Sequence, residues 1–201
     1  MKLSIQTDLR HRGGFSLDRK HAKGMTKMTI LDRLLGHDAW TTRQLLLRSL
    51  ELSDEQLDRE FDIGDRSLRS TFDHIIQCLE HWTDRMMGRP VRQGEWHNGI
   101  ERLLERQTEA AKEFAEFAMK VEREGRADEM FTKPEDGKKL SLGGGIAHIL
   151  THSMHHRAQT LYILEQLGIK NVIEGDALGW ESVARGWGWA AGGSYGDMVV
   201  G

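Results

Sequence analysis

The sequence predicts an all-α protein, an up-down-type four-helix bundle with a small hairpin or loop before its last long helix. Four long segments repeat apolar residues at steps of three and four, which places them on one face of an α-helix. No comparable length of the chain shows the period of a strand. Only 2 of the 201 residues are proline, which leaves room for long uninterrupted helices. Amphipathic helices in this number bury their apolar faces by packing on one another.

The first helix is predicted to begin after Thr29. Thr29 and Asp32 have the spacing of a capping box, in which each side chain bonds to the backbone N–H of the other residue. The apolar face that follows consists of Ile30, Leu34, Leu35, Trp40, Leu45, Leu46 and Leu50. A second box at Ser53 and Gln56 opens a short turn of helix before the helical pattern breaks at residues 64–65.

The second and third long helices are predicted at residues 68–87 and 98–124. The apolar stripe of the second helix consists of Leu68, Phe72, Ile75, Ile76, Leu79, Trp82 and Met86. The third helix carries Ile100, Leu103, Leu104, Phe114, Phe117 and Val121. Gly88 and Pro90 stop the second helix, and Gly125 ends the third.

Residues 130–142 have a different character. The run at 133–137, Lys-Pro-Glu-Asp-Gly, is turn chemistry between two short extended arms. We expect a small hairpin or an ordered loop there. Three glycines at 143–145 then allow the chain to turn into the fourth long helix, predicted at 146–167 and closed by Gly168.

The bundle is expected to span residues 28–168, between two segments of different composition. Residues 1–27 mix basic and acidic side chains without an apolar stretch, which argues against a secretory signal and predicts a disordered N-terminal extension. Residues 169–201 form a Gly/Trp-rich C-terminal tail with a candidate short helix at 180–185. We expect no fixed structure over about the last dozen residues.

Composition excludes several classes of function. The formal net charge is −3 and no helix shows a continuous basic face, so no nucleic-acid partner is expected. No apolar run approaches the ~20 residues of a membrane span. The single cysteine, Cys78, cannot form an internal disulfide and favours a reducing compartment. We therefore expect a soluble cytoplasmic protein.

The residues that point to chemistry are histidines. The chain has 10 of them, and four lie in the fourth predicted helix in the run AHILTHSMHHRAQ. His152 and His156 are one helical turn apart and can direct ring nitrogens at one ion ~2.1 Å away. His148 and His152 share this spacing. On a helical wheel, however, His148 and His155 face solvent, whereas His152 and His156 border the apolar face.

A tight site requires a third ligand from another helix. His74, at the edge of the apolar stripe of the second helix, is the best candidate. His81 lies two turns further along, close to the same face, and is either a rival or a neighbour of the ligands. A helical His-x-x-x-His pair also arises by chance, and most such pairs are solvated or packed without a metal. The spacing alone therefore leaves both interpretations open.

Three segments resemble the DinB/YfiT-like family of metal-binding four-helix bundles. HDAWTTRQLLLRSLELSDEQLDREF resembles the first helix of the family, TFDHIIQCLEHWTDRMMG the second, and HILTHSMHHRAQTLYILEQLG the fourth, with its H-x-x-x-H-R-x-Q pattern. The glycine usual between Arg and Gln is Ala158 here, a small-for-small change. The resemblance covers roughly residues 30–167. It implies that His74, His152 and His156 bind one divalent metal ion.

The resemblance also implies a function. Three neutral imidazoles leave a coordination position open, which is typical of a catalytic ion, and they do not select among Zn, Ni, Fe, Co and Mn. The family suggests a metal-dependent enzyme, hydrolase-like or a thiol-dependent transferase or isomerase, with a small-molecule substrate or low-molecular-weight thiol. The alternative is a non-catalytic metal-binding stress-response protein. Bundles of this family often pair through helix faces, so we expect a homodimer.

Catalytic residues other than the ligands are not assigned by the sequence. Arg157 could clamp an anionic substrate and Glu80 could act as a base, although residues in such positions are more often structural. Gln159 and Trp40 match family positions but serve packing or helix orientation equally well. Cys78, one turn after the first candidate ligand, is more often inert packing than a ligand.

Overall fold

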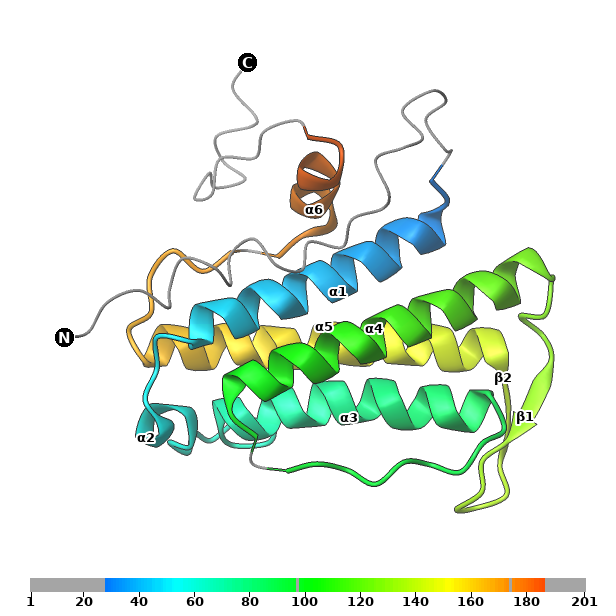
Figure 1. The fold of residues 1–201 in the computed structure, drawn as a ribbon, viewed down its shortest axis with the longest axis horizontal. Helices are drawn as coiled ribbons and strands as arrows, with labels where there is room; N and C mark the ends of the chain where they lie inside the picture. Colours follow the sequence, from blue (N-terminus) through cyan, green and yellow to red (C-terminus); the bar gives the residue numbers. More distant parts are fainter. Residues whose placement is uncertain (1–27, 97, 174, 187–201) are drawn as a thin grey trace.

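The computed structural model describes residues 28–96, 98–173 and 175–186, and its centre is a bundle of four long helices (Figure 1). These helices are α1 (Ile30–Ser49), α3 (Leu68–Met86), α4 (Ile100–Arg123) and α5 (Leu142–Gln166). Both α1 and α3 pack against α4 and α5. The predicted all-α bundle is confirmed.

The connections set the directions of the helices (Figure 1). The short helix α2 (Asp54–Leu57) and the loop after it turn the chain between α1 and α3, which run in opposite directions. The segment after α3 is extended and returns along that helix, so α4 runs in the same direction as α3. In agreement, Leu68 and Ile100, the first residues of α3 and α4, lie in one apolar cluster. The directions are therefore up, down, down and up.

Hydroxyl side chains cap the N-termini of α1, α2, α3 and α5, whereas α4 begins after Gly99 without a side-chain cap. Thr29 and Ser53 form the predicted capping boxes of α1 and α2. Ser67 and Ser141 cap α3 and α5, each through one hydrogen bond from a backbone N–H in the first turn. These caps satisfy N–H groups that have no partner within their own helix.

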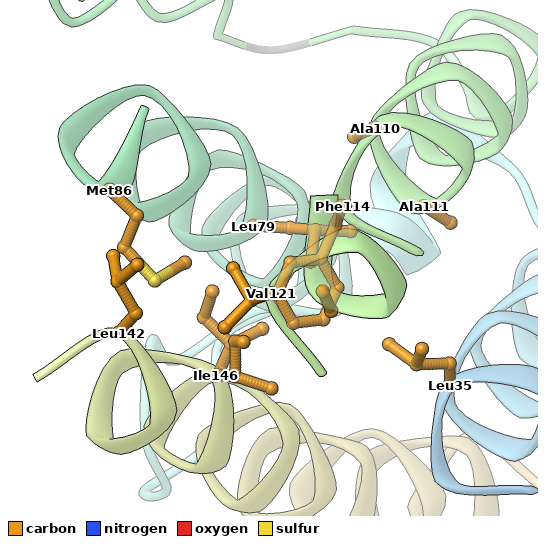
Figure 2. Packing of buried hydrophobic residues seen from close by; sticks show 11 residues of the cluster. Leu35, Leu79, Met86, Ala110, Ala111, Phe114, Val121, Leu142 and Ile146 are labelled. Atoms are coloured by element: carbon orange, nitrogen blue, oxygen red, sulfur yellow. The ribbon is translucent and has the colours of Figure 1, made fainter. Parts of the chain in front are cut away.

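The core consists of two apolar clusters with a layer of polar side chains between them. Figure 2 shows the cluster toward the hairpin end, where Phe114 and Val121 of α4 pack with Leu142 and Ile146 of α5. The second cluster lies toward α2 and includes Phe72. Along α1, α4 and α5 the buried polar residues fall between the two clusters. This polar layer consists of Asp38, Thr41, Thr42, Arg106, Gln107, Ser153, His156, Arg157 and Thr160.

Helix α1 buries a more polar face than its apolar residues predict. Ile30, Leu34 and Leu50 were expected in the core, yet they are 77%, 42% and 37% exposed. The buried face instead includes His37 and Asp38. Apolar periodicity alone misses these two residues because their partners, the Gly175 carbonyl and Arg157, lie on other segments.

The hairpin forms as predicted. Strands β1 (Met130–Thr132) and β2 (Lys139–Ser141) pair antiparallel, with Phe131 opposite Leu140. Helix α5 begins directly after β2, four residues earlier than expected, because Ser141 caps it and its first turn takes in the three glycines. A Cβ at Gly145 would lie 2.6 Å from Met86 Sδ, so the glycine at this position allows close packing against α3.

The C-terminal segment packs on α1. Helix α6 (Ala177–Ala184) covers most of the candidate helix at 180–185, and the ring of Trp180 lies against Gly36. The expectations for residues 1–27 and for the last dozen residues of the tail fall outside the described residues. None of the helices that the structure describes has an apolar stretch long enough to cross a membrane.

Candidate metal centre

Three histidines from two helices converge at one place in the bundle. His74 lies in the first half of α3, and His152 and His156 lie one turn apart on α5, the helix that packs beside α3. The ligand atoms of the three rings all lie within 4.8 Å of one another. The structure thus brings together the three residues singled out in the sequence.

The ring nitrogens approach as ligands of one ion do. Nε2 of His74 and Nε2 of His152 are 3.0 Å apart. Two nitrogens each ~2.1 Å from the same ion would be separated by roughly 3.0–3.4 Å. Nδ1 of His156 lies 2.8 Å from Gln159 Oε1, to which it can donate, and this leaves Nε2 of His156 available.

The pKa values of the two ligand candidates on α5 are lowered, which favours their neutral form. Burial, together with the neighbouring His156 and His74, lowers the pKa of His152 from 6.5 to about 4. Burial also lowers the pKa of His156, against the opposing effects of Gln159 and the Asp65 carboxylate. A neutral imidazole has the free lone pair that a metal ligand needs.

The other histidines of α5 are at the rim. His148 and His155 are both exposed, as the helical wheel predicted. The ring of His148 stacks on that of His152 with centroids 5.2 Å apart, and it also lies 4.7 Å from the ring of Trp82. His155 Nε2 lies 3.0 Å from Gln159 Nε2. Neither His148 nor His155 is a member of the three-histidine cluster.

The two weak catalytic candidates lie in ion pairs away from the cluster. Arg157 is buried in the polar layer, where it pairs with Asp38 and donates to Ser153 Oγ at 2.9 Å. Glu80 is buried and accepts from the Arg106 guanidinium at 2.8 Å. Both arrangements match the structural role that such residues more often have.

Cys78 is the thiol nearest to the cluster. Its Sγ lies 3.4 Å from His74 Nε2, but Cys78 is not within range of all three histidines. Burial, together with the charge of Asp65, raises the pKa of the thiol to about 11. The thiol is therefore protonated near neutral pH. His81 and Trp40 are half-buried and are likewise not members of the cluster.

Asp65 is the residue of the site that sequence reasoning missed. Its Oδ2 lies 4.0 Å from Nδ1 of His74 and 3.7 Å from Nδ1 of His156. In the sequence it was only part of a break in the helical pattern. It follows the short helix α2 in a loop, where no periodicity indicates which way a side chain faces.

A small cavity lies beside the cluster. It measures about 240 Å³ and shares Cys78 with the surroundings of His74. Its lining consists of Gln77, Cys78, His81, Trp82, Arg85 and Lys133. Arg85 pairs with Glu135, and Lys133 pairs with Asp136 at 3.3 Å, so both cations of the lining have anionic partners.

The site fits a divalent metal ion by two separate features. Three neutral nitrogen donors are a ligand set that first-row transition metals accept. In addition, Asp65 Oδ2 is buried and accepts no hydrogen bond in the described part of the chain. A buried carboxylate oxygen without a partner is costly, and a nearby 2+ charge would offset that cost.

Comparison with known proteins identifies the family of the chain. No curated protein matches the chain. The family model described as the DinB superfamily matches residues 38–160, which is more than half of the chain and includes all three histidines. The chain belongs to the DinB superfamily.

Proposed function

We propose that this protein binds one divalent metal ion through His74, His152 and His156, and that it is a metal-dependent enzyme acting on a small molecule. The observation that carries the proposal is the convergence of three imidazoles from α3 and α5 within 4.8 Å. In the described part of the chain no carboxylate or thiol joins them at that range. This supports an ion with an open coordination position.

Such an ion, when bound, supplies Lewis acidity: it lowers the pKa of a bound water or stabilises a substrate thiolate. The chain's own residues have the task of holding and shielding it. Trp82 covers one side of the site through its contact with His148. Gln159 holds the ring of His156 in one orientation. The ligand set allows Zn, Ni, Fe, Co or Mn.

The cavity beside His74 is the proposed entrance for a substrate. Arg85 and Trp82 give its lining both a cationic and an aromatic part. Because Glu135 and Asp136 already pair with the cations of this lining, it suits a small molecule without a large net charge. Hydrolase-like chemistry and thiol-dependent transfer both use an open position on the ion, so we propose this pair of reaction types and no narrower one.

A non-catalytic role in metal binding or stress response is the second candidate. The size of the cavity favours it, because about 240 Å³ is below the ~300–1,000 Å³ of most ligand sites. The two candidates differ in one test. A thiol or anion that binds the metal-loaded protein and fails to bind the metal-free protein supports the enzyme.

Assembly and location follow as proposals. We propose a homodimer in the cytoplasm, with no nucleic-acid and no membrane partner. Sedimentation equilibrium of the purified chain gives the mass directly. A mass of one chain at micromolar concentration would rule out the dimer.

The experiment for metal binding is elemental analysis of the purified protein beside two variants. His152→Ala removes a ligand, whereas His155→Ala removes an exposed histidine of the same helix. We expect about one equivalent of metal in the wild type and in His155→Ala, and a loss of most of it in His152→Ala. Equal metal content in all three proteins would contradict the proposed site.

A further inference from the structure

We propose that Asp65 is the positioning residue of the metal centre: its carboxylate holds the Nδ1 side of the ligand rings and balances part of the charge of the ion. The inference rests on the proposed metal binding and adds a residue from outside α3 and α5. Asp65 lies in the loop between α2 and α3.

The position of the carboxylate carries the inference. Oδ2 faces Nδ1 of His74 at 4.0 Å and Nδ1 of His156 at 3.7 Å, so one atom lies near two rings on two different helices. Their opposite side is the metal-binding side, since Nε2 of His74 meets Nε2 of His152. An acceptor near Nδ1 selects the tautomer that keeps Nε2 free for an ion.

Gln159 and Asp65 each serve as the Nδ1 acceptor of a different ligand ring. Nδ1 of His156 already lies 2.8 Å from Gln159 Oε1. The carboxylate is therefore left for Nδ1 of His74. A separation of 4.0 Å is longer than a hydrogen bond, so the proposal requires Oδ2 of Asp65 and Nδ1 of His74 to approach by about 1 Å when an ion is bound.

Charge supports the same assignment. Asp65 Oδ2 is buried and accepts no hydrogen bond in the described residues. The adjacent cation, Arg66, is exposed and pairs instead with Glu60 at 2.8 Å. Three neutral imidazoles leave the charge of a divalent ion uncompensated. A carboxylate at the backs of two of the rings and an ion at their fronts stabilise each other.

The backbone of the loop is shaped to present this side chain. Gly64 and Arg66, on either side of Asp65, both have positive φ, at 48° and 71°. The Phe61 amide donates to the Arg66 carbonyl at 2.7 Å and closes the loop. A left-handed residue other than glycine carries a conformational cost, which is typical of functional loops.

Gly64 also ties the loop to the ligand helix. A Cβ there would lie 2.2 Å from Oε1 of Gln159, the atom that faces His156 Nδ1. The loop, Gln159 and His156 therefore form one packed unit. A side chain at position 64 would displace the amide that holds His156.

The test compares Asp65→Asn with the wild type, with Asp62→Asn as a matched control on the same loop. Asp62 is exposed, whereas Asp65 Oδ2 is buried. Metal affinity is measured with Zn²⁺ by competition with a chelator. We expect Asp65→Asn to bind Zn²⁺ 10–100-fold more weakly and Asp62→Asn to bind it like the wild type. The melting temperature of metal-free Asp65→Asn should equal or exceed that of the wild type, because a carboxylate oxygen without a hydrogen-bond partner is gone.

Two further measurements separate positioning from other roles. Histidine ¹H–¹⁵N spectra of the Zn²⁺-loaded protein should show a protected Nδ1–H on His74, and faster exchange of that proton in Asp65→Asn. Asp65→Glu, which keeps the charge, should recover part of the affinity.

Loss of all Zn²⁺ binding in Asp65→Asn, as in His152→Ala, would instead make Asp65 a direct ligand and overturn the inference. Wild-type affinity in Asp65→Asn with none in His152→Ala would also overturn it but leave the proposed function intact. Equal affinity in all variants would refute both.

Discussion

Buried charged side chains in the middle of the bundle are paired across helices. Arg157 of α5 pairs with Asp38 of α1, and Arg106 of α4 pairs with Asp73 and Glu80 of α3. Arg157 and Glu80 could be picked out from the sequence as candidates for catalysis, but their partners lie 119 and 26 residues away. A local pattern cannot show such pairs, so it could not separate a structural cation from a substrate clamp.

Arg157→Ala is expected to destabilise the protein. The change leaves Asp38 buried without its counter-charge, and breaking a buried pair in this way costs about 3–5 kcal/mol in the free energy of unfolding. Urea denaturation of the metal-free protein measures this loss in the free energy of unfolding. In the double variant with Asp38→Ala the loss should be smaller than the sum of the single losses. Wild-type stability in Arg157→Ala would argue for a role at the site instead.

Asp84 is expected to set part of the stability in acid. Burial alone would raise its pKa, but hydrogen bonds from Arg92 and Arg89 lower the pKa from 3.8 to about 2. Because the folded value is the lower one, the stabilisation is complete above pH ~4 and is lost as the pH falls toward 2. Asp84→Asn should therefore be less stable than the wild type at pH 6, with a smaller further loss between pH 4 and 2. If the free energies of unfolding of the two proteins changed with pH in parallel, this prediction would be contradicted.

At the scale of elements, local chemistry predicted most of the helices and the hairpin. The caps at Thr29 and Ser53 and the turn chemistry at residues 133–137 act within a few residues, so they are visible in the sequence. The early start of α5 could not be predicted from the sequence, because glycine normally disfavours a helix. Here its small size permits contact with Met86, a feature of the tertiary structure.

Helix α6 lies beyond the residues matched by the family model, and it packs on α1 through one buried aromatic side chain and an ion pair. The ring of Trp180 occupies the space that a side chain at position 36 would take. Glu181 adds an ion pair with Arg33 at 2.9 Å, and His37 Nε2 lies 2.5 Å from the Gly175 carbonyl. Together these contacts join the C-terminal segment to the bundle.

Trp180→Ala should weaken this attachment. Trp180 is buried, and removing a buried tryptophan costs about 3–5 kcal/mol in a well-packed core. We expect faster hydrogen exchange throughout Ala177–Ala184, measured by mass spectrometry. Leu178→Ala, at a residue 51% exposed on the same helix, is the control and should change little. Unchanged protection in Trp180→Ala would show that α6 is held by other contacts.

In the whole molecule, a layer of polar side chains lies between the two apolar clusters. The three histidines lie where α3 and α5 pack against each other. Helical periodicity made the three histidines candidates, because His152 and His156 share a helix face and His74 borders an apolar stripe. The resemblance to the DinB/YfiT-like family then singled them out as a ligand set. Neither signal indicated Asp65, whose approach depends on the backbone of a loop.

Metal binding should stabilise the folded chain as a unit. An ion that binds only the folded state raises the free energy of unfolding by about 4 kcal/mol at a free concentration 1,000 times its Kd. We expect Zn²⁺ to raise the melting temperature of the wild type and of His155→Ala, and to leave that of His152→Ala almost unchanged. A shift of equal size in all three would indicate binding elsewhere.

X-ray absorption at the metal edge tests the central claim most directly, because it reports the ligands of the ion themselves. For the Zn²⁺- or Co²⁺-loaded protein we predict scattering from three imidazoles bound through nitrogen at ~2.1 Å, with a further light atom from solvent in the open position. His152→Ala should lose this signature. A spectrum without imidazole scattering, or one dominated by sulfur from Cys78, would contradict the account.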